Sequence, residues 1–209
     1  MEFYTASWTK DPKFVELHES FNKIAGIDFN LNNSWYERLY ILRQLAEQQS
    51  NKNKKFIECG VYAGQSMYFI SDLCNNEFIG IDSFEGVSDP GEFDSEYFNT
   101  VKLKLDISYT KNILKNKTNV NLIKGWIPSV FNNMDKNEYS YIHIDVDLYE
   151  PTKTSIEYLW PQLINGGVLI CDDYGSDKTP GAKKAMEEYF SKTKILELPT
   201  GQAVVFKNE

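Results

Sequence analysis

The chain has 209 residues, of which 42% are hydrophobic and 25% charged, values typical of one globular domain with a full core. A net charge of −8 without a basic stripe argues against a nucleic-acid partner. Because no apolar run reaches membrane-spanning length and no basic region precedes an apolar stretch at the N-terminus, we expect no membrane partner and a cytoplasmic location.

Residues 1–50 are predicted to form an N-terminal cap or lid and a helix. The first 33 residues are polar and aromatic with weak periodicity, and we expect His18 to lie on the surface. Ser34 and Glu37 have the spacing of a capping box, and leucines follow at helical spacing. A polar linker then leads into the main domain, residues 51–209, within a single globular unit.

Strands and helices alternate along the main domain. Apolar runs predict strands at 56–59, 78–81, 120–123, 139–144 and 168–171. Helices are predicted at 65–74, around Pro151 and from Pro180, and a closing hairpin at 195–198 and 203–206. This order predicts an α/β fold with a seven-stranded, mostly parallel sheet between two helical layers, an antiparallel C-terminal strand, and ligands at the carboxyl ends of the strands.

Two other features concern the segment 84–119 and the cysteines. A lid is expected to emerge from 84–119, with some helix, because Val101, Leu103 and Leu105 are surrounded by lysines. The three cysteines lie in apolar segments without C-x-x-C spacing. They are therefore expected to be buried free thiols in a reducing compartment: Cys59, Cys74 and Cys171.

Pairs of carboxylates follow two of the predicted strands. Asp145 and Asp147 come after the strand 139–144, and Asp172 and Asp173 after the strand 168–171. If these strands are parallel neighbours, the four acids meet at one edge of the sheet, where mutual repulsion raises their pKa values unless a cation binds. Oxygen ligands at this density suit Mg²⁺. The alternative is that they cap helices or are solvated loop acids.

The turn after the first strand contains Glu58, Gly60 and Gly64. Glycines let the backbone approach a ligand, and an acid there suits an amino group such as that of S-adenosylmethionine. The G-x-G-x-x-G fingerprint of pyrophosphate binders is missing. Asp82 ends the second strand, where an acid can accept both hydroxyls of a ribose. Alternatively, Gly60 forms a plain tight turn and Asp82 caps the segment after the strand.

Several motifs of the chain resemble the macrocin O-methyltransferase (TylF-type) family of S-adenosylmethionine- and Mg²⁺-dependent sugar O-methyltransferases. The similar segments are FIECGVYAGQS, FIGIDSFEGV, LIKGWIPSVF, YIHIDVDLYEPTKTSIEYLWPQLINGGVLICDDYG and PGAKKAMEEYF, and they extend over about residues 55–190 in order. The resemblance implies a three-layer, Rossmann-like class I methyltransferase fold. Residues 1–33 are shorter than the N-terminal region usual in the family, which contributes to the lid and substrate pocket.

The resemblance also implies roles for individual residues. The methionyl end of the cofactor would be held by Glu58, Gly60, Gly64 and Ser66; the ribose by Asp82; and the adenosine would be surrounded by Ser83, Phe84, Gly125 and Trp126. The metal would be bound by Asp145, Asp172 and Asp173, with Asp147 as the candidate general base.

The predicted chemistry is deprotonation of a hydroxyl that attacks the sulfonium methyl. Mg²⁺ held partly by Asp145 would chelate two adjacent hydroxyls and lower the pKa of one, and Asp147 would take the proton. The expected partner is therefore a small-molecule or glycan acceptor with adjacent hydroxyls, a sugar or a catechol, and a homodimer is the candidate assembly. His143 lies inside an apolar strand and is expected to be a core residue or to support the site without direct contact.

Three other functional classes compete with this prediction. A glycosyltransferase would use Asp145 and Asp147 as a D-x-D metal site, but it would not require Glu58, Gly60 or Asp82. A nicotinamide-dependent dehydrogenase would need the missing glycine fingerprint. A non-catalytic binding protein with the same fold would have no physical reason to hold four aspartates together.

Overall fold

The computed structural model describes residues 7–28, 30–31 and 34–208, so predictions about residues 1–6, 29 and 32–33 lie outside the described part. The helices are α1 (Pro12–Ala25), α2 (Ser34–Glu47), α3 (Gln65–Ile70), α4 (Ile107–Ile113), α5 (Tyr149–Leu159) and α6 (Pro180–Tyr189). The strands are β1 (Lys55–Cys59), β2 (Phe78–Asp82), β3 (Val120–Lys124), β4 (Tyr139–Ile144), β5 (Leu163–Cys171), β6 (Leu196–Glu197) and β7 (Ala203–Phe206). None of the described helices is long and apolar enough to cross a membrane.

The strands form one seven-stranded sheet in the order β3-β2-β1-β4-β5-β7-β6. The first five are parallel, whereas β7 runs antiparallel to both β5 and β6. The predicted mixed sheet with an antiparallel C-terminal strand is confirmed. Because β4 and β5 are parallel neighbours, the residues that follow them lie at the same edge of the sheet.

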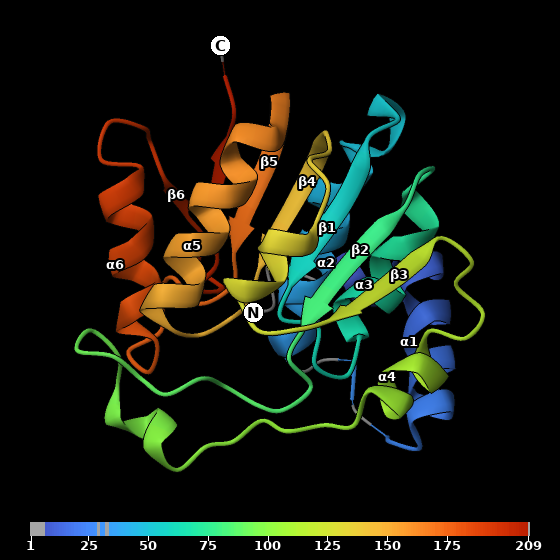
Figure 1. Ribbon diagram of the computed structural model, residues 1–209. Coiled ribbons are helices and arrows are strands. Elements are labelled where there is room, and N and C mark those ends of the chain that lie inside the picture. Colours follow the sequence, from blue (N-terminus) through green and yellow to red (C-terminus); the bar gives the residue numbers. More distant parts are fainter. Residues whose placement is uncertain (1–6, 29, 32–33, 209) are drawn as a thin grey trace, which may run out of the picture.

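Helices cover both faces of the sheet, which confirms the three-layer prediction. Figure 1 shows α5 and α6 on one face and α1, α2 and α3 on the other. Neighbouring strand residues point to opposite faces, so Phe56 and Tyr141 enter one apolar core while Ile57 and Ile142 enter the other. All three cysteines are buried and free, as predicted.

The N-terminal helices are part of a helical layer. Asp11 caps α1 through the backbone N–H groups of Lys13 and Phe14, and the Phe14 ring packs against Phe69 of α3. His18 lies on the same face of α1 and contacts Tyr36, with only 8% of its surface exposed, so the expected surface position is wrong. Residues of α1 and α2 share one core with the sheet. The domain division at residue 50 stays a prediction.

A long connection follows β2, and we call residues 83–106 the strap. It runs along the carboxyl edge of the sheet, reaches α5 and α6, and returns to α4 (Figure 1). The Asp94 carboxylate accepts a hydrogen bond from the backbone N–H of Tyr149 at the start of α5 (2.8 Å). Helical turns occur at Glu96–Asn99 and in α4, as expected for 84–119. Val101, Leu103 and Leu105 are not helical, so the reason given for that helix was wrong.

Candidate active site

A cavity of about 1250 Å³ opens at the carboxyl ends of β1, β2, β4 and β5, with further walls from α2 and the strap. Most of the predicted site residues line this cavity: Glu58, Gly60, Ser66, Asp82, Ser83, Gly125, Trp126, Asp145, Asp147, Asp172 and Asp173. Gly64 and Phe84 do not line it. Residues more than 100 positions apart in the sequence therefore share one cavity.

The two glycines of the first turn serve different purposes. Gly60 has a φ of 90°, and a Cβ there would collide with the backbone carbonyl oxygen of Asp145. Gly60 thus lets the ends of β1 and β4 come together beneath the cavity. Gly64 has a φ of 79°, and a Cβ there would meet the side chain of Thr110 in α4 at 2.9 Å. Gly64 therefore packs against α4 and does not border the cavity.

Glu58 is a buried carboxylate with one free oxygen. Its Oε1 accepts a hydrogen bond from the Ser66 hydroxyl, whereas its Oε2 is buried without a hydrogen-bond partner. An unpaired carboxylate oxygen in such a position has a substantial free-energy cost. Since Glu58 borders the cavity, this oxygen fits the ammonium group of a bound amino acid.

Asp82 stabilises the turn that carries Gly60. Its Oδ2 accepts hydrogen bonds from the backbone N–H groups of Val61 (2.9 Å) and Tyr62 (2.8 Å), and its Oδ1 accepts one from Phe84 (2.6 Å). A carboxylate offers about four acceptor positions, so about one remains for a ligand hydroxyl. The ribose role stays a prediction, and both roles considered for Asp82, ligand acceptor and cap, are compatible with this geometry.

The four residues predicted around the adenosine differ in accessibility. The Ser83 hydroxyl donates to the carbonyl oxygen of Gly86 (2.8 Å), which fixes the start of the strap. Phe84 is buried in the apolar core and is therefore a packing residue. Gly125 lines the cavity, and the neighbouring Trp126 is 38% exposed there. An exposed indole beside a cavity is suited to stacking on a flat ring.

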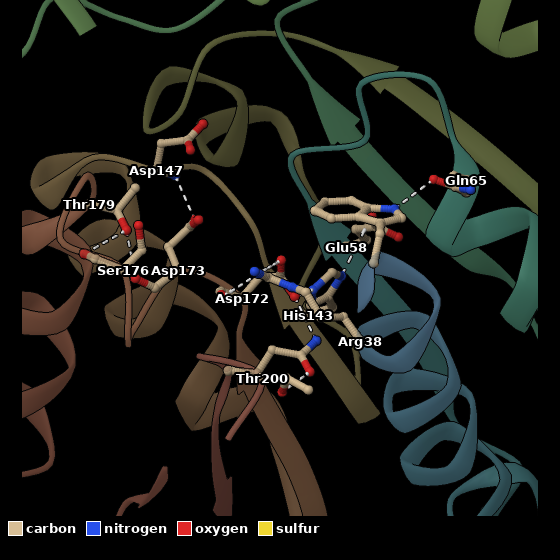
Figure 2. Close-up of polar contacts among 12 residues, drawn as sticks. Arg38, Glu58, Gln65, His143, Asp147, Asp172, Asp173, Ser176, Thr179 and Thr200 are labelled. Carbon is tan, nitrogen blue, oxygen red and sulfur yellow. Dashed lines mark hydrogen bonds and ion pairs between the residues drawn. The ribbon is translucent and has the colours of Figure 1, made fainter. Parts of the chain in front are cut away.

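The four predicted acids, which we call the acid cluster, converge at the ends of β4 and β5. Figure 2 shows Asp147, Asp172 and Asp173 next to one another, with His143 beside Asp172. Asp147 has a positive φ of 63°, a conformation that aspartate tolerates better than most residues. Its backbone N–H donates to Asp173 Oδ2 (3.0 Å), which links the two strand ends.

The charges of the acid cluster perturb one another. Burial raises the pKa of Asp145 well above its usual range, and Asp172 and Asp173 raise it further. Burial and the neighbouring acids also raise the pKa of Asp147 to about 6 and that of Asp173 to about 8. Burial opposes ionisation of Asp172 as well, but His143 and Arg38 outweigh it, so the pKa of Asp172 lies below its usual value. The predicted rise in pKa thus holds for Asp145, Asp147 and Asp173 and is wrong for Asp172, which His143 and Arg38 keep ionised.

His143 lies between two buried carboxylates. Its Nδ1 is 3.5 Å from Glu58 Oε1, and its Nε2 is 3.5 Å from Asp172 Oδ1, although neither contact has good hydrogen-bond geometry. Burial lowers the pKa of His143, but the Asp172 and Glu58 carboxylates raise it by more, so its pKa is well above the usual value. A protonated imidazole is a counter-ion and cannot ligate a metal.

Two contacts to the acid cluster were not predicted from the sequence. A guanidinium nitrogen of Arg38, on α2, donates to the carbonyl oxygen of Asp172 (2.6 Å) and forms an ion pair with its Oδ2. The Gln202 amide donates to Asp172 Oδ1 (2.7 Å). Arg38 occupies an ordinary position on an amphipathic helix, and no motif in the sequence marks it.

The residues present fit both predicted cofactors. Among the described residues, atoms of His143, Asp145 and Asp172 lie within 4.8 Å of one another, and Asp173 is not in that group. Since the protonated His143 cannot ligate, Asp145 and Asp172 are the ligands that this group offers. Two carboxylates at this spacing, with Asp147 and Asp173 beside them, match the oxygen donors preferred by a hard divalent cation. The free oxygen of Glu58 in the same cavity fits the amino group of S-adenosylmethionine.

Solved structures with this architecture are class I, Rossmann-like methyltransferases. The structure titled CalS11, calicheamicin methyltransferase, has a TM-score of 0.75 and 19% sequence identity, covering 95% of this chain and 94% of that one. A second structure, titled apo CalS11, TDP-rhamnose 3′-O-methyltransferase, has a TM-score of 0.65 and 19% identity, covering 95% and 96% of the two chains. The predicted fold class is confirmed.

Residues 35–200 match the family described as Macrocin-O-methyltransferase (TylF), and the chain belongs to this family. It is 26% identical over 180 residues to the demethyldecarbamoylnovobiocin O-methyltransferase of Streptomyces niveus, covering 76% of this chain and 67% of that protein. Over 70 residues it is 33% identical to the 8-demethyl-8-(2,3-dimethoxy-alpha-L-rhamnosyl)-tetracenomycin-C 4′-O-methyltransferase of Streptomyces olivaceus, covering 34% and 26% of the two chains. The protein is an S-adenosylmethionine-dependent O-methyltransferase.

Proposed function

We propose that this protein transfers a methyl group from S-adenosylmethionine to a sugar hydroxyl, with a divalent metal bound at the acid cluster. The observation that carries the proposal is the meeting of this cluster with the free carboxylate oxygen of Glu58 in one cavity. Cofactor and acceptor would therefore bind side by side, as methyl transfer requires.

The chain's own residues would orient the cofactor. Glu58 would accept a hydrogen bond from the methionyl ammonium group through Oε2, while Ser66 holds Oε1 in place. Asp82 would accept a ribose hydroxyl with its remaining acceptor position, and Trp126 would stack on the adenine ring. The sulfonium supplies an already activated methyl group, so the protein mainly provides alignment.

The acceptor would bind over the acid cluster. Asp145, Asp172 and Asp173 would hold Mg²⁺, which lowers the pKa of a coordinated hydroxyl. Asp147 takes the proton of the attacking hydroxyl, since its carboxylate borders the cavity and its pKa of about 6 leaves it mostly ionised at neutral pH. Its backbone bond to Asp173 keeps it beside the metal ligands.

Adjacent hydroxyls on a sugar are the acceptor class that this arrangement supports best. Two oxygens on neighbouring carbons can chelate one cation, and relatives are named for methylation of a rhamnosyl group and of TDP-rhamnose. The strongly acidic cavity disfavours acceptors whose anionic groups would approach the cluster. A glycan acceptor, a homodimer and a cytoplasmic location also stay predictions.

The test is a screen of acceptors with labelled S-adenosylmethionine and Mg²⁺. Nucleotide sugars, free glycosides, catechols, mono-hydroxyl alcohols, carboxylates and amines would be compared at equal concentration. We expect label on sugars with adjacent hydroxyls and little on the last three classes. Transfer confined to mono-hydroxyl alcohols, carboxylates or amines would contradict the proposal. Transfer to catechols and not to sugars would keep the chelation argument and refute the sugar assignment.

A further inference from the structure

Arg38 brings a positive charge into the acid cluster. The residue projects from α2 and borders the cavity, with 22% of its side chain exposed. Figure 2 shows its guanidinium reaching Asp172 from the side opposite to Asp147 and Asp173. It lowers the pKa of Asp147, Asp172 and Asp173, although it is not the largest influence on any of them.

Asp172 has both of its carboxylate oxygens engaged by protein donors. Arg38 pairs with Oδ2, and the Gln202 amide donates to Oδ1 at 2.7 Å. Asp172 is also one of the groups that converge within 4.8 Å of one another with Asp145. A cation that binds Oδ2 of Asp172 would therefore compete with the guanidinium for this oxygen and be repelled by its charge.

The Arg38 guanidinium has a second contact besides that with Asp172. Its Nε has no hydrogen-bond partner in the described structure, so the guanidinium is held at Asp172 through one nitrogen only. The Trp35 ring lies 5.2 Å from the guanidinium carbon, and a cation over an indole face is stabilised by the ring. Breaking the contact with Asp172 leaves this second contact available at the mouth of the cavity.

We propose that Arg38 is a built-in counter-ion that occupies Asp172 in the absence of metal and leaves Asp172 Oδ2 when a divalent cation binds. The inference rests on the proposed metal site, and it adds that Arg38 competes with the cation for Asp172. Arg38 then has two opposite effects: it stabilises the metal-free protein by neutralising a buried carboxylate, and it weakens metal binding through competition and charge repulsion. It is a positioning residue, since it acts through Asp172.

The test is Arg38→Gln, with Arg38→Lys as a variant that keeps the charge. Calorimetric titration with Mg²⁺ alone should show affinity about tenfold higher for Arg38→Gln than for the wild type, the usual effect of one neighbouring charge. Arg38→Lys should lie nearer to the wild type. In EDTA, Arg38→Gln should lower the Tm by about 5 °C or more, and saturating Mg²⁺ should remove most of that difference.

Arg43→Gln is the matched control, because Arg43 lies on the same helix and pairs with Asp72 (2.6 Å) away from the cavity. It should lower the Tm equally with EDTA and with Mg²⁺. Equal or weaker Mg²⁺ affinity of Arg38→Gln would overturn the inference while leaving the metal site intact. If Arg38→Gln does not fold, an Arg38→Lys affinity lower than that of the wild type would overturn it too. Absence of Mg²⁺ binding in the wild type and all variants would refute the metal site and the inference together.

Discussion

At the scale of single residues, Asp82 combines a structural and a proposed binding role. Two of its bonds to backbone N–H groups hold the turn over which the cofactor would lie, and the third holds Phe84 at the start of the strap. This carboxylate therefore also stabilises the local structure. Asp82→Ala should lower the Tm and weaken S-adenosylmethionine binding by roughly 1.5–3 kcal/mol, the range for hydrogen bonds to a charged group.

Asp106→Ala is the control for Asp82, since Asp106 also accepts a backbone hydrogen bond, from Ser108 (2.8 Å), at the start of α4. It should leave the affinity for S-adenosylmethionine unchanged. Calorimetric titration of the folded variants measures both effects. An Asp82→Ala protein that remains folded and binds S-adenosylmethionine normally would refute the ribose assignment.

Asp147 and Asp172 should be separable by substitution with asparagine. Asparagine tolerates the positive φ at position 147 and keeps the backbone bond to Asp173, so Asp147→Asn removes mainly the proton acceptor. Turnover should fall by about 10² to 10⁴, with Mg²⁺ binding retained. Asp172→Asn should lose both turnover and Mg²⁺ affinity. Wild-type turnover in Asp147→Asn would assign the base to another group.

At the scale of elements, the ends of β4 and β5 make the metal-free protein sensitive to pH. The pKa values of Asp147 and Asp173 are raised to about 6 and about 8 in the folded state, above the usual value of about 4. The folded protein then binds more protons than the unfolded chain, so this contribution to stability is present at about pH 4 and is lost as the pH rises through 6 and 8.

The Tm in EDTA should therefore fall between about pH 6 and about pH 8.5. Saturating Mg²⁺ should reduce this fall, because the cation neutralises the negative charges of the ionised carboxylates. Asp173→Asn should show a shallower dependence, because the residue with the higher of the two pKa values no longer titrates. A Tm in EDTA that is constant or rises over this range would mean that the acids are ionised in the folded protein without a cation.

The strap is held at its far end by the hydrogen bond from Tyr149 to Asp94, for which Gly181 in the first turn of α6 leaves room. A Cβ on Gly181 would collide with Asp94 Oδ1 and lie 2.8 Å from the Tyr149 nitrogen. Gly181→Ala should therefore break the Asp94–Tyr149 bond, worth roughly 1.5–3 kcal/mol. Amide exchange at Tyr149 and proteolysis within the strap should both become faster.

Gly91→Ala is the matched control within the strap, because its Cβ would meet nothing closer than Asp94 Oδ2 at 3.5 Å. Exchange at Tyr149 should stay at the wild-type rate in this variant. If Gly181→Ala exchanges no faster than Gly91→Ala, the strap is not held by Asp94.

At the scale of the whole molecule, local pattern was sufficient to predict the sheet. The predicted strand 139–144 has the same bounds as β4. A mostly apolar run is typical of a parallel strand that is buried on both faces. The sequence was also enough to bring four aspartates together, since strand ends in such a sheet share one edge.

Contacts between distant residues could not be predicted in the same way. Arg38 contacts Asp172 across 134 positions, and a single sequence read by itself carries no signal for such a pair. His18 is buried because its face of α1 packs against α2 and α3, and the polar residues next to it in the sequence give no sign of this contact. Val101, Leu103 and Leu105 alternate with lysines at a period of two, which indicates an extended segment; two of them line the cavity.

The most direct test of metal-dependent sugar O-methylation is one measurement of methyl transfer. The purified protein would be treated with EDTA, mixed with labelled S-adenosylmethionine and a nucleotide sugar that has adjacent free hydroxyls, and assayed before and after excess Mg²⁺. We predict no transfer above background in EDTA and restored transfer to one of the two hydroxyls with Mg²⁺. Equal transfer under both conditions would remove the metal from the mechanism and contradict the account.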